Sequence, residues 1–497
     1  MFPSSRLRRA AIAAVALVTL AAVPARAQDR TLNAPTAHAR IGFERIRLPG
    51  DEYVGLLGSS YLVDAPSIPG LAIGPAVYGA ISGHRGGFFT LGGEAAWRRQ
   101  IAGPFGVELG LYAGGGGGAG APVGGGLMLR PHVDLLWDFG PLALGLSVSR
   151  VRFPNGSIDS TQAGIVLDAI NDFRYVPASH LGTPVRSGGR SGFGFDRVQL
   201  VAGAYRTRSD LTLSDGTSAP QSLSMLGIRA EQSFSPNWYW GLEANGATQR
   251  AVAGYAEYLG VVGYETEAVT RTLNLGARVA LGMGGGGGVP TGGGFLAKAA
   301  VYGIVRMTNE LGLALELGAV DAPQGRLHAG EASLGLVWSL DGPDASGAPA
   351  RPTRTDFSAG LLRYHAPRRD GSERSLVADV LRFDRYLTPH LYVSGEVHSA
   401  VSGDAGGYSA ALLGLGWSQP LAGGVRIGAE VLGGASGGGG VKSQGSIVRP
   451  MGWLAWQLTP AVSLRLGAGH VHSPHGGLSS TAADAALIFT YGVGMGS

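Results

Sequence analysis

The densest group of residues able to do chemistry is the segment HVHSPH, residues 470–475. A serine hydrolase needs a hydroxyl and an imidazole within hydrogen-bonding reach. In a strand, His470 and Ser473 are three residues apart and point to opposite faces, and Ser473 reaches His475 only across Pro474. His470 and His472 could place two imidazoles on one face for a metal ion. The segment favours a solvated loop, so we predict no catalytic residue, no metal site and no cofactor.

A second set of candidates consists of charged residues that share a face with small residues in alternating segments. They are Arg130, Asp134, Lys298, Glu316, Arg449 and Arg465. We predict that they point into the interior of a barrel. In a wide barrel they would line the lumen and bias permeation toward anions, whereas in a narrow barrel they would form ion pairs that fill the interior.

The elements that position these residues have the period of a β-strand. In residues 127–138, Arg130 and Asp134 share one face while Leu135 and Trp137 share the other. Residues 142–149, 272–281, 311–320 and 462–469 alternate in the same way. Segments of about ten residues match a tilted strand that crosses a bilayer. The polar face is mostly Gly, Ala and Ser, so the apolar face is expected to contact lipid and not a second sheet.

Composition and the amino-terminal segment point to an exported membrane protein. Arg6, Arg8 and Arg9 precede an apolar run, and Ala25-Arg26-Ala27 matches a cleavage site, so residues 1–27 are expected to be a signal peptide. Glycine makes up 85 of the 497 residues and charged residues 15%, against about 25% charged residues in typical soluble domains. The chain has no Cys, which excludes disulfides and a lipoprotein anchor.

Three glycine runs, which begin at Gly114, Gly284 and Gly437, mark an internal repeat. Matching SGHRGG and SGDAGG segments precede two of the runs, and Arg130-Pro131 and Arg449-Pro450 follow them in the same place. Each unit divides into eight segments of strand length, which predicts about 24 antiparallel strands in total. An even number of strands leaves both chain ends on the periplasmic side, with the glycine hairpins and the longer loops outside the cell.

Two arrangements of these strands fit the sequence. The predicted units are 28–176, 197–340 and 357–497, and they are joined by the polar segments 177–196 and 341–356. Segments of this length and composition resemble interdomain linkers, which favours three tandem eight-stranded barrels. Single large barrels are the commoner arrangement, and we slightly favour one barrel of about 24 strands.

The glycine runs are not phosphate-binding loops, because no Lys-Ser/Thr pair follows them. The charge balance, 39 basic and 35 acidic residues without a basic cluster, does not indicate binding to nucleic acid.

With its leader, alternation and turn pattern, the whole mature chain resembles Gram-negative outer-membrane β-barrel proteins. The resemblance implies an all-β transmembrane fold, contact with outer-membrane lipids and insertion by the β-barrel assembly machinery. The carboxyl end departs from the family, because Phe489 and Tyr491 are followed by a glycine-rich tail in place of a terminal aromatic residue.

Three functions remain open at this point. The first is a passive channel or export pore for small solutes or a polymer. The second is a non-conducting surface protein whose filled barrels display loops. The third, a lipid-modifying enzyme, ranks last because no catalytic group is evident, so the chain is predicted not to be an enzyme.

Overall fold

The computed structural model describes residues 32–183, 185–186, 190–266, 269–270, 272–340, 349–350 and 352–495. The expected signal peptide, residues 1–27, and part of the expected second linker lie outside the described residues. The described chain is almost entirely antiparallel β-structure, with three short 3-10 helices: η2 (Ala178–His180), η3 (Arg250–Val252) and η4 (Ala422–Gly424). Among the described residues, no helix is long and apolar enough to cross a membrane.

The first eight strands form a closed barrel, barrel 1, in which each strand pairs with the next and β8 returns to pair with β1. They are β1 (Thr36–Leu48), β2 (Glu52–Asp64), β3 (Leu71–Ser82), β4 (Phe89–Ala102), β5 (Phe105–Gly117), β6 (Met128–Asp138), β7 (Leu142–Arg152) and β8 (Asp159–Asp172).

Barrel 2 closes in the same way, through pairing of β11 with β18. Its strands are β11 (Arg197–Thr207), β12 (Ser222–Ser233), β13 (Trp238–Ala247), β14 (Ala256–Glu265), β15 (Leu273–Gly285), β16 (Phe295–Arg306), β17 (Leu311–Asp321) and β18 (His328–Ser339).

Barrel 3 closes through pairing of β20 with β27. Its strands are β20 (Pro352–Pro367), β21 (Glu373–Tyr386), β22 (Leu391–Ser402), β23 (Ser409–Pro420), β24 (Val425–Gly437), β25 (Gly445–Gln457), β26 (Val462–His472) and β27 (Ser479–Met495). The segments between barrels add β9 (Val176–Pro177), which pairs with the end of β27, and β10 (Val185–Arg186), which pairs with β19 (Pro349–Ala350).

The expected antiparallel β-barrel of three eight-stranded units is confirmed, but the single large barrel that we slightly favoured is not what the structure has. Each unit closes on itself, because its first strand satisfies the free edge of its own last strand. In barrel 1 this pairing extends from Thr36↔Asp172 to Glu44↔Gly164. A closed barrel leaves no unpaired edge to which the next unit could add its strands.

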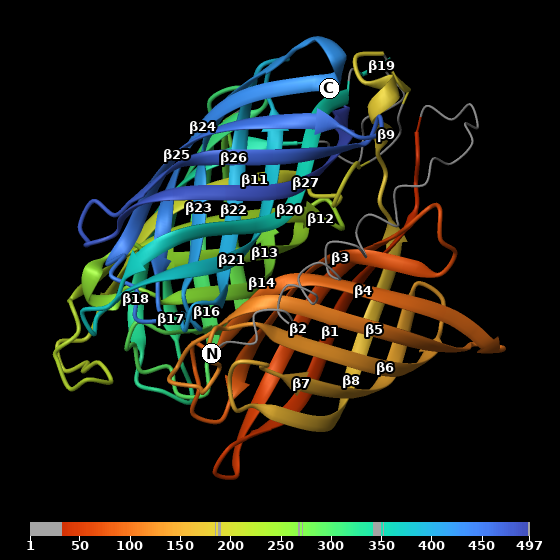
Figure 1. The fold of residues 1–497 in the computed structure, drawn as a ribbon. Helices are drawn as coiled ribbons and strands as arrows, with labels where there is room; N and C mark the ends of the chain where they lie inside the picture. The colour runs from red at the N-terminus through yellow and green to blue at the C-terminus, as the bar shows by residue number, and fades with distance from the viewer. Residues whose placement is uncertain are drawn as a thin grey trace.

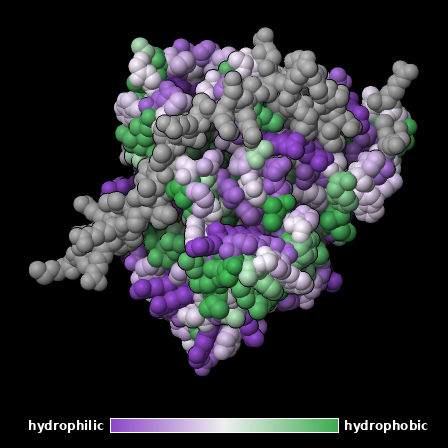
Figure 2. Space-filling view, turned by 90° about the vertical axis from the view of Figure 1, so that its right-hand side faces the viewer, coloured by the Kyte–Doolittle hydropathy of each residue, from purple (hydrophilic) through white to green (hydrophobic). Residues whose placement is uncertain are grey.

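The two faces of the strands divide as the alternation predicts. Large apolar side chains point outward and are exposed, among them Leu146 (67%), Leu334 (62%) and Val301 (61%). The alternate residues are buried inside each barrel. On the face shown in Figure 2, hydrophobic residues gather in patches bordered by hydrophilic ones. An apolar outer surface of this kind is suited to contact with acyl chains.

Short turns with a threonine connect several strands. Thr308, Thr388 and Thr459 each use the side-chain oxygen to accept a hydrogen bond from the backbone N–H three residues on, at 2.9, 2.9 and 3.0 Å. These local bonds fix tight reversals, because the hydroxyl satisfies a backbone donor at the start of the next strand.

The three barrels lie against one another (Figure 1). The connections β3–β4, β5–β6 and their equivalents lie at one end of the barrels, which we call the loop end, and the interbarrel segments lie at the opposite, linker end. At the linker end the ring of Phe193 lies 5.0 Å from Tyr61, 5.5 Å from Phe173 and 6.2 Å from Phe383, as measured between ring centroids. This aromatic residue of the first linker therefore joins barrel 1 to barrel 3.

Candidate functional site: charged clusters inside the barrels

The interior of barrel 1 holds a cluster of charges centred on Arg40. Its guanidinium group lies 2.5 Å from Glu108, 2.5 Å from Asp134 and 3.2 Å from Glu94. The four residues come from β1, β5, β6 and β4, and all are at most 4% exposed. One arginine thus joins three strands of the opposite wall. A buried carboxylate requires a cationic partner of this kind if it is to stay charged.

A second pair in barrel 1 contains Arg130. Its guanidinium donates two hydrogen bonds of 2.9 Å to the carboxylate of Glu44, and Ser149 donates a further bond of 2.6 Å to that carboxylate. The ring of Tyr78 lies 5.1 Å from the guanidinium carbon. The bidentate geometry and the ring together fix Arg130 across the interior.

Barrel 2 contains a carboxylate with three cationic partners, Glu243. It accepts hydrogen bonds from Arg229 at 2.8 Å, Arg278 at 2.6 Å and Lys298 at 2.8 Å. Lys298 also lies 2.9 Å from Glu257 and 3.1 Å from Glu331.

Glu316 completes this network. Arg278 donates a bond of 2.7 Å to Glu316, and Arg229 donates another of 3.1 Å. Every one of these groups is buried, so the cluster forms a cross-linked plug of charges in place of an open lumen.

In barrel 3, Glu396 and Glu430 have the corresponding role. Arg449 and Arg382 both bond to Glu396, the latter at 2.5 Å, and Arg465 lies 2.6 Å from Glu430. Asp484 adds contacts to Arg382 at 3.2 Å and to Arg465 at 3.4 Å.

The structure places all six residues singled out in the sequence inside the barrels, each with an ion-pair partner. Arg130, Lys298 and Arg449 occupy the same register position on the sixth strand of their barrels, because Tyr112↔Arg130, Ala280↔Lys298 and Leu432↔Arg449 pair equivalently. The carboxylate partners of these three residues come from other strands of the same barrel, and sequence reasoning did not identify them. A signal was available in the alternation, because charged residues such as Arg40, Glu243 and Glu396 fall on the strand face opposite to the large apolar residues.

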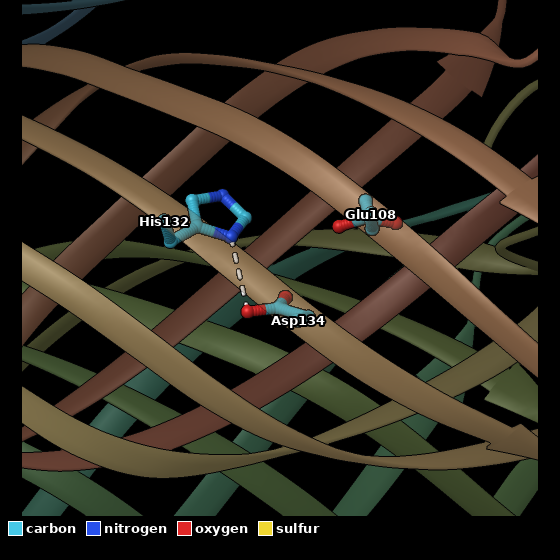
Figure 3. Close-up of side chains that lie close together, drawn as sticks. All are labelled: Glu108, His132 and Asp134. Carbon is cyan, nitrogen blue, oxygen red and sulfur yellow. Dashed lines mark ion pairs between the residues drawn. The ribbon is translucent and has the colours of Figure 1, made fainter.

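One group in barrel 1 has side chains suited to a metal ion. Ligand atoms of Glu108, His132 and Asp134 all lie within 4.8 Å of one another, and Figure 3 shows His132 directed toward Asp134. The two ring nitrogens of His132 lie 3.2 Å from Asp134 and 3.4 Å from Glu94. Arg40 already lies 2.5 Å from both carboxylates of the group, so its positive charge takes the place that a cation would need.

The interior space between these side chains is small. A cavity bordered by Arg40, Glu44, Glu94 and Arg130 has a volume of about 20 Å³. This volume is enough for about one water molecule. An eight-stranded barrel of this kind is filled by its own side chains.

The histidine-rich segment lies at the loop end of barrel 3. His470 Nε2 lies 2.9 Å from the hydroxyl of Ser479 on the next strand, and this pair is exposed. Sequence reasoning considered only serines within the segment and missed this cross-strand partner. Within the described residues, no acidic group bonds to the other ring nitrogen of His470. Ser473 is buried and bonds to the carbonyl of Ser443.

Comparison with known proteins gives no closer classification than the fold. No family model matches the chain, and no curated protein matches its sequence. The solved structures that match include outer-membrane β-barrel proteins.

OpdQ of Pseudomonas aeruginosa is 8% identical over 92% of this chain and 97% of its own, with a TM-score of 0.21. OccK2 (OpdF) of the same organism, in complex with glucuronate, is 10% identical over 93% and 98%, with a TM-score of 0.22. The siderophore receptor PiuA of Acinetobacter baumannii is 9% identical over 92% and 82%, with a TM-score of 0.28. TM-scores this low support no inference about substrate or mechanism.

Proposed function

We propose that this protein is a non-conducting β-barrel protein of a Gram-negative outer membrane, in which three filled barrels form a rigid base for the loops at the loop end. The observation that carries the proposal is the interior of the barrels. Glu243, Glu396 and Arg40 each bind two or three opposite charges across the interior. Opening a path would separate buried charges from their partners, which is strongly unfavourable.

Membrane insertion is supported by the outer surface. Exposed leucines and valines cover the middle of the strands, and aromatic residues such as Trp137, Trp238 and Trp417 lie near strand ends. This distribution is typical of barrels whose apolar band meets lipid and whose aromatic girdles meet the headgroups. Outer-membrane lipids and the β-barrel assembly machinery are the partners that this environment implies.

The surface at the loop end contains a cleft. A cleft of about 280 Å³ lies between the loops of barrels 2 and 3, bordered by Ser214, Asp215, Arg369 and the glycines 287–288 and 438–440. A volume near 300 Å³ is the lower limit for small-molecule sites. The display of such a surface requires a rigid base, which the ion-paired barrels supply.

A passive channel or export pore, the first function suggested by the sequence, would need a path through interiors that these buried ion pairs cross. The two functions are separated by conductance of the purified protein in planar bilayers. We expect no current steps at any voltage. The protein used must co-float with lipid vesicles of the same composition as the planar bilayer. Stable current steps from such protein would overturn the proposal and favour the pore.

A further inference from the structure

The barrels meet at the loop end through glycine residues. Gly87 of barrel 1 lies against Gly286 of barrel 2, so closely that a Cβ atom on Gly87 would overlap its backbone. A Cβ on Gly254 of barrel 2 would lie 2.8 Å from the backbone nitrogen of Gly438 in barrel 3. A Cβ on Gly407 of barrel 3 would lie 2.8 Å from the backbone nitrogen of Gly118 in barrel 1.

Contacts within each barrel complete a closed ring. The backbone of Gly118 meets that of Gly87, Gly286 meets Gly254, and Gly438 meets Gly407. All six glycines have φ between 87° and 114°, a conformation that residues with a side chain rarely adopt. The glycine ring, as we call it, consists of Gly87, Gly118, Gly254, Gly286, Gly407 and Gly438.

Backbone hydrogen bonds reinforce two of the three contacts between barrels. Gly86 N donates to Gly292 O at 2.8 Å, which joins barrel 1 to barrel 2. Gly407 N donates to Gly116 O at 2.8 Å, which joins barrel 3 to barrel 1. Such bonds form only where two backbones approach without side chains between them.

The contacts follow one rule around the ring. Each fifth strand ends in a glycine run, and the registers Phe89↔Gly117, Ala256↔Gly285 and Ser409↔Gly437 make the runs equivalent. The run of barrel 1 meets the third-to-fourth strand turn of barrel 3, that of barrel 3 meets the turn of barrel 2, and that of barrel 2 meets the turn of barrel 1. This is a head-to-tail contact that closes after three units.

Two residues before the equivalent glycines Gly117, Gly285 and Gly437, the three contacts differ in side-chain size. Met283 of barrel 2 occupies the space left by Gly79 of barrel 1. Ala435 of barrel 3 lies against Gly246 of barrel 2, and a Cβ on Gly246 would be 2.9 Å from that of Ala435.

At the third contact the size relation is reversed. Gly115 of barrel 1 leaves room for the strand at Ser399 of barrel 3, and its backbone nitrogen donates to the carboxylate of Asp379 at 3.2 Å. At the position equivalent to Asp379, barrel 1 has Leu57 and barrel 2 has Leu226.

We infer that these three contacts fix the cyclic order of the barrels. Each glycine run accepts only one of the three turns, so the single chain folds into a ring of three barrels. Exchange of partners would place Met283 against Ser399 and Asp379. The methionine would overlap the strand there, and the carboxylate would lose the hydrogen bond from the backbone nitrogen of Gly115. Loss of a hydrogen bond from a buried carboxylate is destabilising. All three runs and all three turns are used, so no copy of this contact is free for a second chain.

Disulfide cross-linking tests the order, because the chain contains no cysteine. We expect the double variant Gly246→Cys with Ala435→Cys to oxidise to an intrachain disulfide, since a slight separation of the strands brings the two Cβ atoms to the required distance of about 3.5–4.5 Å. The matched control is Gly246→Cys with Gly115→Cys, which joins the same turn to the wrong run and should remain reduced. A disulfide in the control pair, or bonds between chains in either pair, would overturn the inference.

A size exchange tests the contact between barrels 1 and 2 independently. Gly79→Leu is expected to lower the temperature at which the folded form is lost in detergent, and the added substitution Met283→Gly is expected to restore most of the shift. A Gly79→Leu variant as stable as the parent, or a double variant less stable than Gly79→Leu alone, would contradict the size relation.

Discussion

Glu243 is the carboxylate with the most cationic partners inside barrel 2. Its negative charge compensates three buried cations. Arg229, Arg278 and Lys298 all lie within 2.8 Å of its oxygens. The side chain can be made neutral with little change of shape, which isolates the contribution of the charge.

We therefore predict that Glu243→Gln lowers the free energy of unfolding by about 3–5 kcal/mol, the range for loss of one partner from a buried ion pair. Urea titration of the protein in lipid vesicles, followed by tryptophan fluorescence, measures the change. Glu310→Gln, in an exposed turn, is the control and should change stability little. Equal stability of the two variants would show that the cluster is not a tightly packed network.

His470 and Ser479 are the residues on which a lipid-modifying activity would depend. Their hydrogen bond of 2.9 Å is exposed, and no acidic group of the described chain orients the imidazole. A nucleophilic serine needs a base that is itself held in place.

We predict that purified protein and its His470→Ala variant release fatty acid from phospholipid vesicles at the same background rate. Chromatography of the released acids is the measurement. Hydrolysis that is present in the parent and lost in the variant would establish the enzyme and exclude the purely structural role.

The strands show how far local sequence decides structure. The alternating segments 142–149, 311–320 and 462–469 lie within the strands Leu142–Arg152, Leu311–Asp321 and Val462–His472. Period-two alternation and turn residues are local signals, and they determine strands and their outward faces.

The outward face gives a depth-dependent prediction for β7. Leu146 lies near the middle of this strand and Leu142 at its start, and both are exposed. Leu146→Arg should destabilise the protein in vesicles by about 2–4 kcal/mol, and Leu142→Arg by about 0–1 kcal/mol, because an arginine at the bilayer midplane is farther from water. Equal and small effects at both positions would mean that the surface faces water and would refute the membrane-embedded fold.

At the scale of the whole molecule, the glycine ring leaves no unused contact of its kind. Each of the three barrels gives one glycine run to a neighbour and receives another. A ring that is closed within one chain has no place for a further subunit at this surface.

The protein is therefore expected to be a monomer in detergent. Light scattering during size-exclusion chromatography, with the detergent mass subtracted, should give a mass close to that of one chain, which is 50.8 kDa for all 497 residues. A mass of two or three chains would show that the chain uses another surface for assembly or that the ring opens.

The sequence by itself determined the strands, the apolar outer face, the repeat and the inward direction of residues such as Arg130 and Lys298, because all of these follow from spacing along the chain. It did not determine whether the inward charges line a channel or fill the interior. Arg130 meets Glu44 across 86 residues of sequence, and pairing at that distance depends on the diameter of the barrel.

Only the tertiary structure decided that diameter. The edge of β8 could pair with β1 or with the first strand of the next unit, and both pairings satisfy the same backbone groups. Closure of each unit on itself sets eight strands per barrel, brings opposite charges within bonding distance, and leaves the glycine runs at the outside, where each one meets a neighbouring barrel.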